Sequence, residues 1–419
     1  MGLIRTIPGR AFAAAACAAL LPLAAACGTA EGQEPRSLKG HARSVPAADP
    51  APYARADTEF GLALLDRWCR AEPDRNLVLS PSSLAAGLGM AALGARGDTA
   101  TAMAKALRLP AGDPVPGLAA RTAALRGVRR DGVELRVTDQ IWADRGLPPA
   151  QDYLDRVATA YDADVKSLDI RSDPEGARRA INAAVADATA GRITGLLGER
   201  TVTADTGWVL TDAVYLKADW DTAFKRSDTG TEPFTTAAGN RADVRMMSSG
   251  HSLRTARAGG WTAVDLPYKG GRLSMTALLP DSGARGCPSL RADDVDGVVK
   301  ALTPGLVSLS FPKLDLKTRL DAVPLLKDLG MGPAFGDDAD FTGLSPHATS
   351  LGFVRHAAMM KVDERGTEAA AATGAGIGAT AVPQPRERIV FDRPYVLVVR
   401  DGTTGEPLFL ARVADPSEA

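Results

Sequence analysis

The sequence has few of the residues that metal sites and hydrolase active sites need. It contains four histidines and four cysteines among 419 residues, and the motifs HExxH, CxxC and GxSxG do not occur. A zinc site lacks its usual ligand spacing, and an acyl-transfer enzyme lacks a recognisable nucleophile. We therefore expect a protein that is not an enzyme and that binds no metal or other cofactor.

An excess of charge of one sign is also missing. Lysine and arginine total 49, aspartate and glutamate total 50, and the formal net charge is −1. Such a chain has no global field that favours nucleic acid or an anionic membrane surface as a partner. A modest basic cluster at Arg121, Arg126, Arg129 and Arg130 predicts a solvated helix face, with a polyanion site as the alternative.

A long apolar run occurs at the N-terminus. Two arginines precede AFAAAACAALLPLAAAC, which is the order of an export signal, and the run is too short and too rich in alanine for a membrane helix. Leu23–Gly28 resembles the processing site of a bacterial lipoprotein. We expect residues 1–26 to be removed and Cys27 to carry a lipid, which would be the chain's one link to a membrane. The protein would then be extracellular or anchored at the cell surface; an ordinary cleaved signal is the alternative.

Apart from Cys27, two cysteines remain after that cut, Cys69 and Cys287. They could pair in an exported protein, but the sequence gives no distance between them, so two separate thiols are an equal alternative. Residues 27–55 are rich in glycine, proline and alanine, which predicts a flexible tether. The folded domain is expected over residues 56–419.

Helical and strand patterns divide the rest of the chain. Helical patterns come first, in ADTEFGLALLDRWCRAE, SPSSLAAGLGMAALGARG and DPEGARRAINAAVADATAGRITGLL. Strand patterns dominate the second half, in GWVLTDAVYL, RLSMTALLP, LVSLSFPKL and RIVFDRPYVLVVRD. This order predicts an α+β fold with a helix-rich N-terminal half and large mixed or antiparallel sheets.

The stretch DERGTEAAAATGAGIGATAV contains the G-x-G-x-x-A spacing of a dinucleotide-binding turn. No buried strand precedes it, and Pro383 and Pro385 remove backbone donors where the following helix would run. With a period of two, one face carries small or β-branched residues and the other carries the single charge, at Glu368. The segment can be an exposed loop or a middle strand; a plain glycine–alanine linker is the alternative.

Part of this stretch, ERGTEAAAAT, resembles the hinge of an inhibitory serpin's reactive loop. Other motifs follow in the order of that family, including NLVLSPSSLAAGLGMAALGARGDTATAMAKAL, LTDAVYLKADWDTAFKRSDTGTEPF and FDRPYVLVVRDGTTGEPLFLARVADP. Together they cover nearly all of residues 56–416. The resemblance implies the serpin fold, with an exposed reactive loop at about residues 364–386.

The resemblance also implies a single-use inhibitor of serine, or cysteine, proteases. The target protease cleaves the loop and forms a covalent acyl-enzyme, and the loop then inserts into the main sheet before deacylation. The implied partner is the target protease, and we expect a monomer. A non-inhibitory serpin that acts as a binding or chaperone-like protein is the alternative. The hinge residues that the resemblance implies are Glu364, Gly366, Thr367, Glu368, Ala369, Ala370, Ala371, Ala372 and Thr373. The small residues among them favour inhibition.

The position of the cleaved bond follows from the usual loop length of the family. Counting from Gly366 places this reactive bond between Thr380 and Ala381, whereas counting backward from Pro394 places it near Pro383. We follow the forward count, because hinge length is tied to the strand that must insert. The residues around the bond are small or apolar, so we expect elastase-like or subtilisin-like targets.

By resemblance, a gate admits the loop into the sheet, and its residues are Ser80, Ser83, Asp212, Trp220 and His356. Asp212 stands where serpins usually have asparagine. A buried carboxylate beside an imidazole favours the charged imidazole, so we expect gate opening to depend on pH near neutrality. A core histidine with satisfied hydrogen bonds is the alternative for His356.

Overall fold

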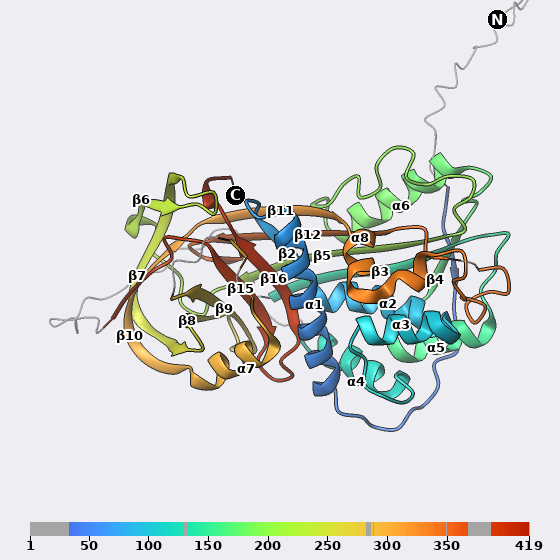
Figure 1. Ribbon diagram of the computed structural model, residues 1–419, viewed down its shortest axis with the longest axis horizontal. Coiled ribbons are helices and arrows are strands. Elements are labelled where there is room, and N and C mark those ends of the chain that lie inside the picture. The colour runs from blue at the N-terminus through green and yellow to red at the C-terminus, as the bar shows by residue number, and fades with distance from the viewer. Residues whose placement is uncertain are drawn as a thin grey trace, which may run out of the picture. The chain divides into compact units, whose positions relative to one another are not determined.

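Helices and two β-sheets make up the domain. The structure is a computed structural model, and it describes residues 33–128, 133–281, 286–287, 289–348, 350–367 and 387–418. Figure 1 shows most of the helices gathered at one end of the domain and many strands at the other. The helices are α1 (Ala51–Ala71), α2 (Pro81–Gly94), α3 (Gly97–Ala106), α4 (Val115–Arg126), α5 (Gln151–Tyr161), α6 (Pro174–Ala188), α7 (Ala292–Ala301) and α8 (Val323–Leu326).

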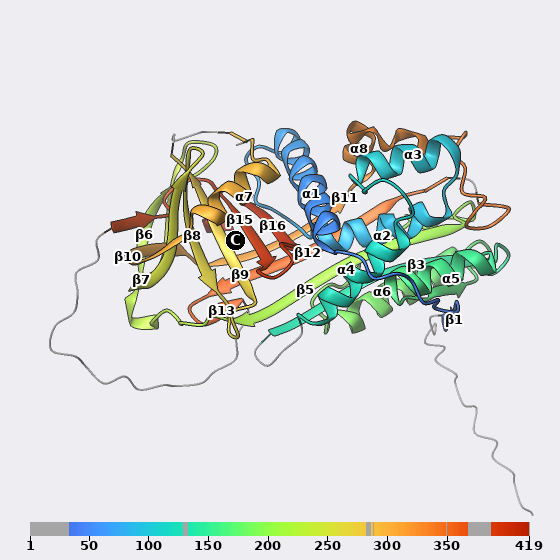
Figure 2. The same ribbon diagram turned by 90° about the horizontal axis from the view of Figure 1, so that it is seen from below.

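Sheet A, with seven strands among the described residues, positions the candidate site. Its order is β1 (Arg36–Leu38), β4 (Val165–Leu168), β3 (Val133–Asp144), β5 (Trp208–Asp219), β13 (Gly366–Thr367), β12 (Val354–Asp363) and β11 (Leu314–Asp321). Strands β5 and β12 are parallel and pair directly as far as Tyr215 and Met359. Beyond that point β13 lies between them, antiparallel to both. Figure 2 shows β5 as a long strand that passes the helices and ends beside β13.

Sheet B contains the other strands that the structure describes. Its order is β14 (Glu387–Val390), β10 (Thr303–Pro312), β7 (Arg241–Ala258), β8 (Trp261–Pro267), β9 (Leu273–Pro280), β15 (Tyr395–Asp401), β16 (Pro407–Val413) and β2 (Leu77–Leu79), and β6 (Thr229–Thr235) pairs with β7. Every residue of β9, β15 and β16 is buried. These strands therefore form a packed interior layer rather than a solvent-facing surface.

Helix α2 brings two predicted gate residues to the centre of the domain. Its N-cap is Ser80, whose side chain accepts a hydrogen bond from the backbone N–H of Ser83, and Pro81 fits the first turn. Small residues allow close packing around this buried helix. A Cβ atom at Gly89, for example, would lie only 2.1 Å from the Tyr161 hydroxyl oxygen.

The two faces of sheet A pack against different apolar cores. Ala358, Met360 and Val362 of β12 belong to a core shared with sheet B. Ala357, on the opposite face of the same strand, packs with residues of α6 such as Ile181. Separating β5 from β12 therefore disturbs packing on both faces of the sheet.

The structure differs from the predicted flexible tether over residues 33–55. Strand β1 pairs with the edge strand β4, and helix α1 begins at Ala51, so the folded domain begins before Ala56. The backbone N–H of His41 donates to the Asp155 carboxylate over 2.8 Å. Composition misses this segment because backbone pairing and polar contacts hold much of it, while few large apolar side chains, such as Leu38, Val45 and Tyr53, pack against the core.

The predicted solvated helix face is wrong at Arg121. Its side chain is 3% exposed and lies between the carboxylates of Asp57 and Glu406, at 2.5 and 2.9 Å. Arg126 is exposed and paired with Asp162, as on a solvated face. The paired carboxylates compensate the Arg121 charge, which allows its burial. The remaining two arginines of the cluster lie outside the described residues.

The order of elements confirms the predicted α+β class. Helices α1–α6 come before residue 190, and sheet strands dominate the chain after it. Among the described helices, none is both long and apolar enough to span a bilayer.

Candidate functional site

The first residues of the predicted hinge already lie within sheet A. Gly366 and Thr367 form β13 and pair with β12 on one side and with β5 on the other. A Cβ atom at Gly366 would lie 2.1 Å from the carbonyl oxygen of Ala218, so the approach of β5 requires glycine at this position. Thr367 is 1% exposed, and its hydroxyl oxygen lies 2.7 Å from that of Tyr268.

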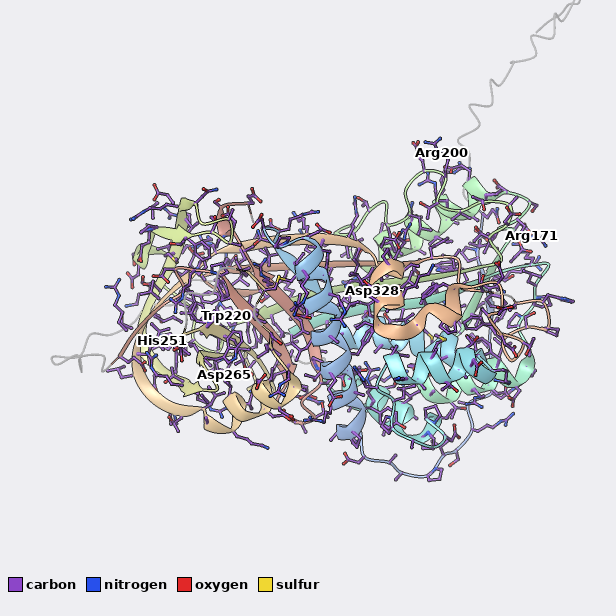
Figure 3. All side chains as sticks on the ribbon, in the orientation of Figure 1. Arg171, Arg200, Trp220, His251, Asp265 and Asp328 are labelled. Atoms are coloured by element: carbon purple, nitrogen blue, oxygen red, sulfur yellow. A yellow bond between two sulfur atoms is a disulfide. The ribbon has the colours of Figure 1, made fainter. Side chains whose placement is uncertain are left out.

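Trp220 fixes the turn that precedes β13. Its backbone N–H donates to the carbonyl of Arg365 over 2.7 Å, and its indole N–H donates to the carbonyl of Asp363 over 3.0 Å. The indole stacks on Tyr268 with ring centroids 4.6 Å apart. Figure 3 shows Trp220 at the end of the domain that is opposite Arg171. The stacked pair therefore sits where the loop would begin to enter the sheet.

Glu364 binds this turn to two other segments. Its carboxylate accepts hydrogen bonds from the hydroxyl of Thr229 at 2.9 Å and from the Lys313 ammonium at 2.8 Å. Burial alone would raise the pKa of Glu364, but these bonds outweigh it and hold the pKa below its usual value. The hinge is thus held by a charged group as well as by backbone pairing.

A second cluster lies deeper in the sheet, around His356 of β12. The Nδ1 atom of His356 is 2.5 Å from Oδ1 of Asp212 on β5, and the backbone N–H of Ser80 donates to Nε2 over 3.1 Å. Since Nε2 accepts a hydrogen bond, it carries no proton, and this pattern assigns the proton to Nδ1. The ring thus bridges Asp212 of β5 and the N-cap of α2, and the pH dependence of gate opening stays a prediction.

Asp139 of β3 is a member of this cluster that the sequence analysis missed. It pairs in register with Asp212, and its carboxylate accepts a hydrogen bond from the Ser83 hydroxyl. Desolvation, followed by the negative charge of Asp212, raises the pKa of Asp139 well above its usual value. Val137, Asp139 and Ile141 occupy alternate positions of the strand and so share a face, but the sequence does not show that this face brings Asp139 to Ser83.

The structure divides the predicted gate into two places. Ser80, Ser83, Asp212 and His356 meet in the deeper cluster, whereas Trp220 lies at the end of β5 with the hinge. Glu364, Gly366 and Thr367 lie where the prediction expects a hinge. Outside the described residues lie the rest of the hinge (Glu368, Ala369, Ala370, Ala371, Ala372, Thr373), the reactive bond (Thr380, Ala381) and Cys27.

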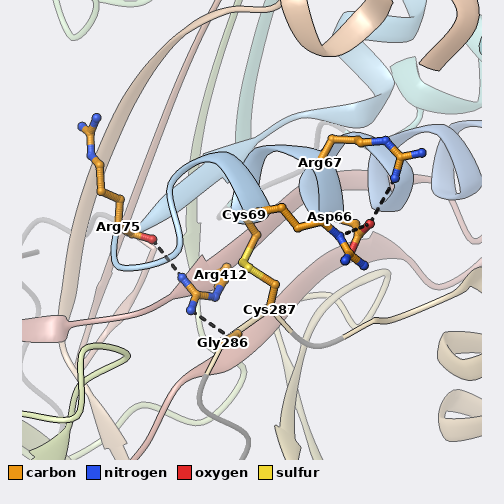
Figure 4. Close-up of a disulfide and its surroundings, with 8 residues drawn as sticks. Asp66, Arg67, Cys69, Arg75, Gly286, Cys287 and Arg412 are labelled. Carbon is orange, nitrogen blue, oxygen red and sulfur yellow. Dashed lines mark hydrogen bonds and ion pairs between the residues drawn. A yellow bond between two sulfur atoms is a disulfide. The ribbon is translucent and has the colours of Figure 1, made fainter. Parts of the chain in front are cut away.

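The two cysteines whose pairing the sequence left open form a disulfide. Cys69 belongs to α1, Cys287 comes shortly before α7, and their Cα atoms are 5.8 Å apart. The guanidinium of Arg412 lies beside the bond and donates to the carbonyls of Arg75 and Gly286 (Figure 4). The disulfide joins two segments separated by 218 positions in the sequence.

Comparisons with known proteins agree on one family. The model of the serpin (serine protease inhibitor) family matches residues 55–416. Leukocyte elastase inhibitor of Sus scrofa is 31% identical over 376 residues, which cover 86% of this chain and 98% of that protein. Serpin B4 of Homo sapiens is 28% identical over 402 residues, covering 87% and 99% of the two chains.

Solved structures show the same fold. The native-state crystal structure of tengpin, a thermophilic serpin, has a TM-score of 0.81 and 25% identity, and covers 91% of this chain and 100% of that one. The crystal structure of maspin has a TM-score of 0.79 at 22% identity, covering 88% and 99% of the two chains. The arrangement of sheets A and B is therefore the one that these proteins share.

Proposed function

This chain belongs to the serpin family of protease inhibitors, which are not catalytic enzymes, and we propose that it is a suicide inhibitor of serine proteases. A target cleaves the reactive loop and forms an acyl-enzyme. The loop then inserts into sheet A between β5 and β12, before the acyl-enzyme is hydrolysed. The observation that carries this proposal is β13, because two hinge residues already occupy the path of the inserting strand.

The energetics favour continued insertion from β13. An inserted strand of about 15 residues would add roughly 15 ladder hydrogen bonds of about 0.5–1.5 kcal/mol each, or on the order of 10 kcal/mol before entropy. The side chains that follow Thr367 in the sequence are mostly alanine, glycine and threonine. Such small side chains fit a central strand with little steric cost.

The residues around the expected reactive bond suggest the class of target. Thr380 and Ala381 are small, and arginine and lysine are absent from residues 366–385. Proteases with shallow apolar pockets, such as elastase-like and subtilisin-like enzymes, accept these residues, whereas a trypsin-like pocket requires a cation. A leukocyte elastase inhibitor is among the relatives, which supports the same choice.

We also propose that the protein is exported, from a bacterial-type lipoprotein signal, and held at the cell surface by a lipid on Cys27. The disulfide between Cys69 and Cys287 supports an oxidising compartment, because such bonds persist mainly outside the cytosol. We expect the protein to act as a monomer, since the mechanism needs one domain and one target.

The direct test is to mix the purified protein with pancreatic elastase and to separate the products in SDS. The proposal predicts a covalent band with the summed mass of protease and inhibitor. The same experiment with trypsin should give no such band. Rapid loop cleavage without the band would instead favour the alternative, a non-inhibitory serpin.

A further inference from the structure

A basic hollow opens on the face of sheet A that carries α6. Its volume is about 410 Å³, and Ala357 and Met359 of β12 line it. Four cationic side chains also line the hollow: Arg75, Arg192, Lys317 and Arg319. Because the whole chain has a net charge of −1, this gathering does not follow from composition.

Three of these cations have partners of different charge among the described residues. Lys317 lies 3.2 Å from the carboxylate of Asp315, and Arg75 lies 2.7 Å from that of Glu72. Within the described part of the chain, Arg319 has a neutral partner, because its guanidinium donates to the carbonyl of Thr194 over 2.7 Å. A guanidinium with further N–H donors beside an ammonium is a suitable environment for an anion with several oxygens.

The walls of the hollow come from the connection between α6 and β5 and from strands β11 and β12. Arg192 and Thr194 lie in that connection, whose Ile193 packs in one core with Ala213 of β5 and Ala357 of β12, and the Arg192 guanidinium lies 5.9 Å from the ring centre of Tyr215 on β5. Lys317 and Arg319 lie on β11, which pairs with β12. The hydrogen bond from Arg319 to Thr194 therefore joins β11 to a connection that packs over both strands of the seam.

We infer that this hollow binds a multivalent oxyanion, a phosphate or sulfate ester, and that the bound anion holds the seam closed and slows loop insertion. The binding half of the inference stands on the hollow itself, and the second half rests on the proposed function. An anion that contacts Arg192 and Arg319 together binds the closed sheet better than an opened one. At a ligand concentration ten times the Kd, an anion that must leave before the sheet opens slows insertion about tenfold.

Calorimetry on the full-length protein tests the binding half, at constant ionic strength. The probes are inorganic pyrophosphate for phosphate esters and sucrose octasulfate for sulfate esters, and the tighter binder identifies the class. Arg319→Gln and Lys317→Gln should each weaken binding about three- to tenfold. Arg67→Gln, on the surface of α1, is the matched control and should change nothing. No binding, or equal weakening by the control, would overturn the inference.

The rate of strand uptake tests the second half without a protease. A synthetic peptide with the sequence of residues 366–380 is added to the intact protein, and its incorporation is followed by fluorescence. The probe that binds more tightly should slow incorporation of the peptide into the wild-type protein. The same probe should slow incorporation into Lys317→Gln much less. Arg319→Gln should also raise the basal rate, because it removes the bond to Thr194.

The outcomes separate the two proposals. If the anion binds with the expected variant pattern but leaves the uptake rate unchanged, the inferred effect on the seam is wrong. If the protein traps no protease while the anion binds and slows peptide uptake, the proposed inhibitory function fails and the inference stands.

Discussion

The hydroxyl oxygens of Thr367 and Tyr268 lie 2.7 Å apart in the interior of the domain. Thr367 begins the candidate inserting strand, while Tyr268 comes from the end of β8 and stacks on Trp220. The threonine side chain therefore has one defined position, enclosed by protein and satisfied by one hydrogen bond. Among the described residues, the hydrogen-bond partner of this side chain is a neutral hydroxyl rather than a carboxylate.

Replacing Thr367 with arginine should convert the inhibitor into a substrate. A guanidinium at this buried position lacks a carboxylate partner, so insertion would carry an unpaired charge into the sheet. We expect elastase to cleave Thr367→Arg at the wild-type rate without forming the SDS-resistant complex. Thr367→Ser keeps the hydroxyl group and serves as the control, with complex formation close to that of the wild type. Efficient trapping by Thr367→Arg would contradict the role of β13.

The raised pKa of Asp139 predicts a stability that falls with increasing pH. The folded state holds this proton more tightly than the unfolded chain, whose aspartate has a pKa of about 3.9. The contribution of Asp139 to the free energy of unfolding is therefore fully present below about pH 4. It is lost as the pH rises through the raised pKa of the folded state. Thermal melts from pH 4 to pH 8 should show the melting temperature of the wild type falling relative to that of Asp139→Asn. A constant difference between the two would show that Asp139 does not titrate in this range.

Glu364 should have the opposite effect on stability, which its ionised carboxylate increases as the pH rises. Its pKa is lowered in the folded state, so its contribution is present above the unfolded pKa of about 4.3 and is lost as pH falls. Lys313 is 38% exposed, and solvent screening limits the expected cost of Glu364→Gln to about 1 kcal/mol at pH 7. Urea unfolding should show that cost at pH 7 and none near pH 3. A cost that persists at pH 3 would indicate a steric effect instead.

Removing the disulfide should destabilise the domain without changing its specificity. The bond closes a loop across 218 positions, and loss of such a cross-link costs about 2–5 kcal/mol. Urea unfolding of the double variant Cys69→Ser and Cys287→Ser measures this cost. Denatured wild-type protein should show no reactive thiol at these two positions until it is reduced. Two reactive thiols before reduction would contradict the pairing.

Much of the fold could be predicted from local patterns. Helical periodicity in the first half of the chain and strand-like runs in the second half agree with the observed helices and sheets. They do so because each helix and strand buries an apolar face, which leaves a periodic pattern in the sequence. The hinge prediction rests on the family resemblance and on small residues at alternate positions, and the structure describes only its first part, with Gly366 and Thr367 in β13. Segment 33–50 could not, because it is fixed by pairing with β4 and by Asp155 rather than by its own composition.

The site required knowledge of contacts between distant residues. Tyr268 is 99 positions from Thr367, and no spacing rule joins them. The hydrogen bond that His356 Nε2 accepts comes from the backbone N–H of Ser80, whose orientation the sequence does not show. Asp139 reads as an ordinary strand residue until its register with Asp212 is known. The resemblance to serpins therefore proposed Ser80, Ser83, Asp212 and His356 for the deeper cluster, while their hydrogen bonds follow only from the geometry.

After cleavage, the loop should extend the path that Gly366 and Thr367 have begun between β5 and β12. Differential scanning calorimetry can compare intact protein with protein that a small amount of elastase has nicked near Thr380. The nicked form should unfold at a clearly higher temperature, because the inserted strand adds a full set of ladder bonds. Equal unfolding temperatures, or a lower one after cleavage, would contradict it.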